Sequence, residues 1–184
     1  PLAQRFSGIG IGQEDIRESA LRIGEALAGD EPEVAHIDLL IGKKDGPVGA
    51  AFTRAKASPA LGHEPLLAIL EPNLAVKPPT LLVPTVSIRG MRDASLVYGP
   101  AQAGAAKAVV DSVADGTIPQ AAVDDIVIIA NIFVHPAAVD RKRVYINNYK
   151  AMRHALRRAA EGWPSVHDLV ENKERSRHPF RYSP

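Results

Sequence analysis

Hydrophobic and polar residues alternate most regularly between residues 34 and 41. A period of two puts only apolar residues on one face of this segment, namely Ala35, Ile37, Leu39 and Ile41. The other face carries His36 and Asp38 between apolar neighbours. The pattern predicts a strand that buries one face and presents a histidine and an aspartate on the other.

The segment before this strand has two interpretations. Glu14, Asp15 and Glu18 are typical of the acidic first turn of a helix. Residues 21–27 alternate, however, and include Gly24, which destabilises a helix interior. We therefore expect a strand over residues 21–27 and a loose arm over residues 1–20.

Further apolar runs complete the expected order of elements. Residues 65–70, 80–88 and 126–134 predict three more strands, and Pro84 indicates an edge strand or a bulge because proline has no backbone N–H. Helices are expected over residues 48–56, 93–98, 101–114 and 137–161, and a short one after Pro119. Gly99 and Pro100 are expected to interrupt a helix, which would place Gln102 near a new helix N-terminus.

The resulting order is ββαββααβα, in which strands come mostly first and the long helix comes last. This order predicts an α+β protein, a two-layer sandwich with one helical layer over a mixed sheet. A single domain is expected over residues 21–184.

Composition narrows the class of protein. The chain has 184 residues, 46% hydrophobic and 23% charged, which is ordinary for a globular domain. It contains no cysteine, which excludes disulfides and thiolate chemistry. We expect a soluble, cytoplasmic protein, because no apolar run approaches the ~20 residues of a membrane helix and no signal peptide is recognised.

Candidate chemistry centres on His36 and Asp38. Side chains two residues apart on a strand point the same way and lie about 6.6–6.8 Å apart along it, so one substrate can contact both. Histidine exchanges a proton near neutral pH, and a nearby carboxylate favours its imidazolium form. The alternative is a solvated strand face without a functional role.

Other chemistries have weaker support. His36 and Asp38 provide only two metal ligands, and the sequence contains no HExxH motif and no GxSxG nucleophile elbow. Gln102 could bind a polar heterocycle or lie exposed at a helix corner. A net charge of +1 and 5% aromatic residues argue against nucleic-acid binding.

Five motifs, in order along the chain, resemble the formaldehyde-activating enzyme family. They are GEALAGD at 24–30, EVAHIDLLIG at 33–42, PNLAVKP at 72–78, GPAQ at 99–102 and HPF at 178–180. The resemblance implies a hydro-lyase of one-carbon metabolism, formaldehyde detoxification and methylotrophy. It would condense formaldehyde with tetrahydromethanopterin, giving 5,10-methylenetetrahydromethanopterin and water.

The resemblance also implies a fold like domain 2 of ribosomal protein S5. It implies a homo-oligomer, pentameric in the family, with pterin sites between subunits. The reduced pterin would be a co-substrate, and neither a metal nor a tightly bound cofactor is implied. By the same resemblance His36 is the general acid, and the pterin contacts are Asp38, Leu67, Ser87 and Gln102.

The chain departs from the family at Thr85, where members carry a lysine. Ser87 keeps the hydroxyl of the family threonine two residues later, whereas His63 replaces an aromatic residue. A threonine provides neither the charge nor the reach of a lysine ammonium. The alternative function is therefore a divergent paralogue that binds a pterin or senses formaldehyde without catalysis.

Overall fold

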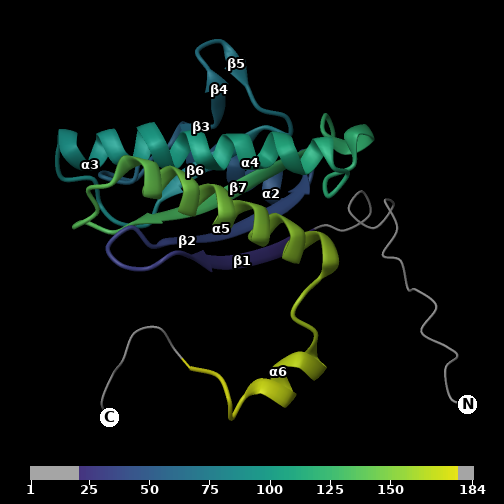
Figure 1. The fold of residues 1–184 in the computed structure, drawn as a ribbon. Helices are drawn as coiled ribbons and strands as arrows, with labels where there is room; N and C mark the ends of the chain where they lie inside the picture. Colours follow the sequence, from purple (N-terminus) through teal and green to yellow (C-terminus); the bar gives the residue numbers. More distant parts are fainter. Residues whose placement is uncertain (1–20, 178–184) are drawn as a thin grey trace, which may run out of the picture.

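A mixed sheet lies at the centre of the computed structural model, which describes residues 21–177 (Figure 1). The predicted arm over residues 1–20 and the HPF motif therefore lie outside the described residues. The sheet has the strand order β1-β2-β7-β6-β3. Its strands are β1 (Arg22–Ala28), β2 (Ala35–Lys43), β7 (Ile126–Val134), β6 (Thr80–Pro84) and β3 (Leu66–Leu67). Only β6 and β7 are parallel, so the predicted strand near residue 21 and the mixed sheet are confirmed.

Two long helices, α4 (Gln102–Ala114) and α5 (Arg141–Glu161), lie side by side over one face of the sheet (Figure 1). The core between the layers includes Ile37, Ile128 and Leu156, all fully buried. Apolar burial of this kind is the main stabilising contribution to such a fold. The α+β class with one main helical layer is therefore confirmed.

The opposite face of the sheet is covered only in part. Helix α2 (Pro47–Ala57) packs Val48 and Phe52 there, against Leu40, Val127 and Ile129. Further along β1, Ile23 is 60% exposed and Leu27 is 40% exposed. This end of the face is open to solvent in a single chain.

Pro84 lies in an inner strand and in regular register with β7, so the expectation of an edge strand or a bulge is wrong. Strand β6 has β7 on one side and β3 on the other. Strand β3, however, pairs only with Leu81 and Leu82, so the missing N–H of Pro84 faces no partner strand. The strand ends at Pro84, and the apolar residues 85–88 continue as a loop.

The apolar run over residues 65–70 supplies more than one strand. After β3, the chain forms a separate hairpin of β4 (Ile69–Glu71) and β5 (Leu74–Ala75). The hairpin projects from the body of the protein in Figure 1. Asn73 adopts a φ of 70° in its turn, a conformation that asparagine tolerates better than most residues.

Gly99 and Pro100 do not interrupt the helix, contrary to the expectation. Helix α3 (Met91–Leu96) continues through a π turn, η1 (Val97–Ala101), into α4. Proline cannot donate to the preceding turn and its ring crowds a carbonyl there, and a π turn widens the helix to accommodate it. The backbone N–H of Gln102 donates to the carbonyls of Val97 and Gly99, so no free helix N-terminus exists at that residue.

The C-terminal helices begin at polar capping residues. Helix α5 begins at Arg141 rather than near residue 137, because the carboxylate of Asp140 accepts hydrogen bonds from the backbone of Lys142 and Arg143. A short 3₁₀ helix, η2 (Gln120–Ala122), follows Pro119, and α6 (Val166–Asn172) begins at Ser165. Within residues 21–177, no helix is long and apolar enough to cross a membrane.

Candidate active site

His36 and Asp38 point away from the helical layer, as the alternation in β2 predicts. Ala35 and Ile37 are completely buried beneath the helices, so the residues between them must face the other side of the sheet. The His36 side chain is 36% exposed there. Its cross-strand neighbours are Leu27 in β1 and Phe133 in β7.

A polar row crosses the three neighbouring strands on this face, made of Glu25, His36, Asp38 and Asn131. The Nε2 atom of His36 lies 2.9 Å from Oε1 of Glu25. The Nδ2 group of Asn131 donates a hydrogen bond of 2.6 Å to Oδ1 of Asp38. The row contains a proton donor, carboxylates and an amide within a mainly apolar surround.

Glu25 and Asn131 both lie in predicted strands, but neither was predicted to have a functional role. The missing information was the strand register, which pairs Asp38 with Glu25 on one side and with Asn131 on the other. The short connection over residues 29–34 suggested an antiparallel pair, and that signal could have located Glu25. No comparable local signal relates β2 to β7, which begins far along the chain.

The remaining predicted site residues form a second group. Leu67 lies in the edge strand β3, Ser87 lies in the loop after β6, and Gln102 begins α4. The Gln102 side chain is buried, and its Oε1 atom accepts a hydrogen bond of 2.9 Å from the backbone of Ile69. Its amide nitrogen donates to no group within residues 21–177, so it is available to a ligand.

Ser87 is held by His63. The Nδ1 atom of His63 lies 2.7 Å from the carbonyl oxygen of Pro84, and its Nε2 atom lies 2.9 Å from Oγ of Ser87. A carbonyl can only accept, so Nδ1 carries the hydrogen and, in the neutral ring, Nε2 accepts from the Ser87 hydroxyl. The lone pairs of Ser87 remain available to accept from a ligand.

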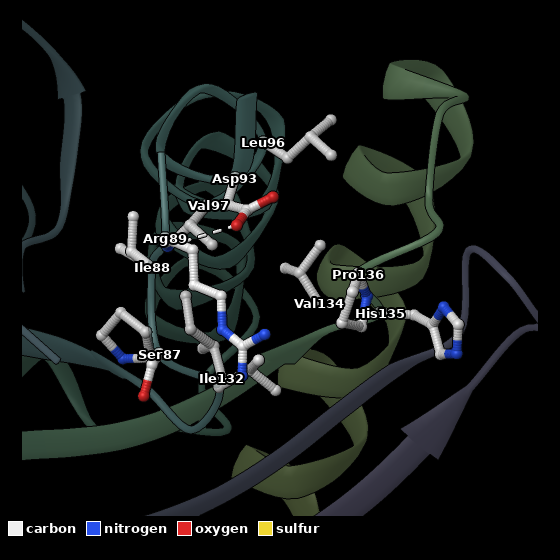
Figure 2. A pocket seen from close by; sticks show the side chains of 12 residues that line it. Ser87, Ile88, Arg89, Asp93, Leu96, Val97, Ile132, Val134, His135 and Pro136 are labelled. Atoms are coloured by element: carbon white, nitrogen blue, oxygen red, sulfur yellow. Dashed lines mark hydrogen bonds between the residues drawn. The ribbon is translucent and has the colours of Figure 1, made fainter. Parts of the chain in front are cut away.

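A mainly apolar pocket opens beside Ser87, at the ends of β6 and β7 (Figure 2). Ser87, Arg89 and Asp93 add polar groups to walls formed by Ile88, Leu96, Val97, Ile132 and Val134. Figure 2 shows the Arg89 side chain extending towards Ile132, whereas the His135 ring turns away. The Arg89 guanidinium makes no hydrogen bond or ion pair with the described residues.

Thr85 and Lys77 supply no cation to this pocket. Thr85 lies just beyond β6, and both its backbone N–H and its hydroxyl donate to the Ile132 carbonyl, at 3.0 and 3.2 Å. Lys77 lies before β6 and forms an ion pair of 2.6 Å with Asp124. Arg89 is therefore the cation that lines this pocket.

One chain does not bring the two groups of predicted residues together. Three strand spacings separate β2 from β3, which corresponds to about 14 Å between the strand axes. Gln102 belongs to the helical layer, on the other face of the sheet from His36. One chain therefore holds His36 and Gln102 on opposite faces of its sheet.

Among residues 21–177, no group of three or more His, Asp or Glu side chains is placed to hold a metal ion. The chemistry available on the open face of the sheet is proton transfer by His36 beside two carboxylates.

Known proteins resemble this chain over most of its length. A profile described as "Formaldehyde-activating enzyme (Fae)" matches residues 23–181. The "5,6,7,8-tetrahydromethanopterin hydro-lyase" of Methanosarcina barkeri is 51% identical over 158 residues, which cover 86% of this chain and 89% of that protein. The "Bifunctional enzyme Fae/Hps" of Archaeoglobus fulgidus is 49% identical over 159 residues, which cover 86% of this chain. The chain spans only 40% of the length of that bifunctional relative.

Proposed function

This chain belongs to the formaldehyde-activating enzyme family, and from that membership we propose that it condenses formaldehyde with tetrahydromethanopterin. The products are 5,10-methylenetetrahydromethanopterin and water. The observation that supports the reaction is His36, a partly exposed histidine on the open face of the sheet with a carboxylate 2.9 Å from Nε2.

In the proposed mechanism, His36 acts as the general acid. A secondary amine of the pterin attacks formaldehyde and gives a carbinolamine. His36 protonates its hydroxyl, the C–O bond breaks, and water leaves an iminium ion. The second pterin nitrogen attacks this ion, closes the methylene bridge and releases one proton. A positioned general acid contributes ~10²–10⁴-fold, and alignment of the two reactants adds to it.

The pterin contacts in this proposal come from Asp38, Leu67, Ser87 and Gln102. Asn131 occupies one oxygen of Asp38, so the other can accept from a pterin N–H. The free amide of Gln102 can donate to a pterin carbonyl, and Ser87 can accept. Leu67 offers apolar contact to the ring.

We further propose that the active form is a homo-oligomer, a pentamer, with each site between subunits. The separation of the two residue groups in one chain supports this arrangement. Ile23 and Leu27, exposed beside the polar row, are apolar residues that a neighbouring subunit would cover. We propose for each subunit a fold like domain 2 of ribosomal protein S5, in keeping with its mixed sheet and helical layer.

A rate measurement tests the reaction. We expect the protein to form the methylene product faster than the uncatalysed background, and His36→Ala to lose about 10²–10⁴-fold of that gain. His167→Ala provides a matched control, because His167 is an exposed histidine on α6. A rate equal to background at saturating protein would contradict the proposed activity.

The second candidate function is a paralogue that binds the pterin or senses formaldehyde without catalysis. Thr85 favours it, since its hydroxyl is bonded to the Ile132 carbonyl and it provides no charge. Pterin binding in a calorimeter without any rate gain would support this candidate. If the missing cation is the cause, Thr85→Lys should recover activity, whereas unchanged inactivity would contradict that cause.

A further inference from the structure

We propose that Glu25 is a positioning residue for His36, which holds its ring so that Nδ1 delivers the proton. The proposal rests on the proposed function, in which His36 is the general acid. It assigns a task to a residue outside the predicted site, on a neighbouring strand.

The strand register makes this contact a diagonal one. Glu25 lies directly opposite Asp38, whereas His36 lies opposite Leu27. Carboxylates that face each other across a strand pair repel one another. Asp38 instead takes its hydrogen bond from Asn131, and Glu25 turns to His36, with 2.9 Å between Oε1 and Nε2.

Arg158 of α5 fixes the other side of Glu25. Strand β1 is an edge strand, and Arg158 reaches it to donate a 2.6 Å hydrogen bond to the Glu25 carbonyl oxygen. The same nitrogen lies 3.5 Å from Oε2 of Glu25. Arg158 also lies over the ring of Trp163, at 4.5 Å from the centroid. The two oxygens of Glu25 therefore face different partners, which fixes the orientation of the carboxylate.

This arrangement determines which nitrogen of His36 can act. The hydrogen on Nε2 stays on the ring, bonded to Glu25, because the carboxylate stabilises the imidazolium. The hydrogen on Nδ1 goes to the hydroxyl of the carbinolamine, the C–O bond breaks, and water leaves. His36 is then neutral with its hydrogen on Nε2. The proton released on closure of the methylene bridge returns to Nδ1, so the cycle balances.

Besides Glu25, two charged side chains of the described residues lie around His36. Strand β2 contributes Asp38, two residues along on the same face, and α5 contributes Arg158 through Glu25. Strand β7 contributes Phe133 and Asn131, which are uncharged. Glu25 is the carboxylate in direct contact with the ring, so its removal should have the larger effect on the imidazolium.

The test compares Glu25→Gln with Glu161→Gln, an exposed glutamate at the end of α5. Glutamine keeps the shape of the side chain and loses its charge. We expect kcat with formaldehyde and tetrahydromethanopterin to fall about 10–100-fold in Glu25→Gln, with KM for the pterin little changed. Glu161→Gln should match the wild type.

Two further measurements keep the proposal separate from the proposed function. In a His36→Ala background, Glu25→Gln should cause no further loss of rate, because the two residues act as one unit. The nitrogen signals of the His36 ring, followed by NMR, should change in Glu25→Gln, because Nε2 loses its carboxylate partner.

Equal kcat values and equal His36 ring signals in the wild type and Glu25→Gln would overturn the proposal. A wild-type rate at background would contradict the proposed activity instead, and the ring signals would still decide whether Glu25 holds Nε2 of His36. A loss of kcat with unchanged ring signals would also overturn it, since Glu25 would then act without affecting His36.

Discussion

Gly24 illustrates how closely a single position can couple two layers of this protein. A Cβ atom at residue 24 would lie 2.0 Å from the carbonyl oxygen of Ala155 in α5. Overpacking of this kind forces backbone shifts. We expect Gly24→Ala to lower the free energy of unfolding by at least about 2 kcal/mol in urea denaturation.

Gly90 provides the control for that measurement. A Cβ atom there meets nothing within 4 Å. Gly90→Ala, at the N-cap of α3, should change the free energy of unfolding by less than about 1 kcal/mol. Equal losses in the two variants would show that the contact between β1 and α5 does not explain Gly24.

Asp115 should make stability depend on pH. Its carboxylate accepts hydrogen bonds from Arg153 and then from Thr117, which hold the pKa of Asp115 well below its usual range. Stability from a depressed carboxyl pKa is present above the unfolded-state value of about 3.9 and is lost as the pH falls towards the folded-state value. Asp115→Asn should therefore be less stable than the wild type at pH 7, and the difference should shrink in acid.

Urea unfolding at several pH values checks this expectation. Asp30→Asn serves as the control, because Asp30 is exposed and makes no hydrogen bond or ion pair within residues 21–177. A difference between Asp115→Asn and the wild type that stays constant down to pH 2 would argue against the Arg153 contact.

The direction in which a side chain points could be predicted from the sequence where burial alternates strictly. His36 and Asp38 follow from Ala35 and Ile37 on the buried face. The partner of His36 could not be predicted in the same way, because Glu25 reaches it diagonally and only after turning away from Asp38. The partner of Glu25 depends on the polar and charged side chains of β1, β2 and β7 together.

Among the elements, α5 depends on its N-cap residue, Asp140, which precedes the helix. The Asp140 carboxylate accepts from two backbone N–H groups at 3.0 Å each. We expect Asp140→Ala to lower the free energy of unfolding by about 1 kcal/mol, because these N–H groups lose their partner. Asp140→Asn, which keeps an accepting oxygen, should lose less, and chemical denaturation measures both.

Element boundaries were harder to predict than element types. Strands β1 and β2 follow from alternation, β7 follows from a continuous apolar run, and the long helix α5 was also predicted, whereas Pro84 and Pro100 were misjudged. In both cases proline removes one backbone hydrogen bond. The effect depends on whether a strand or a helical turn would have accepted that bond. Strand β3 does not reach β6 at Pro84, and a π turn accommodates Pro100.

For the assembled protein, the division of the site predicts complementation between inactive variants. His36→Ala lacks the proposed acid, and Gln102→Ala lacks a proposed contact from the helical layer. If each site takes these residues from neighbouring chains, an equal mixture refolded together should regain about one quarter of the wild-type activity. The rate after mixing, compared with each variant alone, measures this.

The mixing experiment distinguishes a site shared between subunits from a site within one chain. Recovery would place His36 and Gln102 of one site on separate chains. A mixed oligomer that shows only the sum of the two parent rates would contradict a site shared between subunits. Native mass spectrometry of the mixture confirms that mixed oligomers formed.

The separation of His36 from Leu67 and Gln102 also bears on how activity responds to dilution. If the proposed site lies between subunits, a lone chain holds His36 without the rest of the proposed binding surface, so catalytic capacity per chain should follow mass action. Below the dissociation constant of the oligomer, specific activity should fall with concentration although every chain remains folded. In a cell, the amount of protein made would then determine the activity of each chain as well as the number of chains.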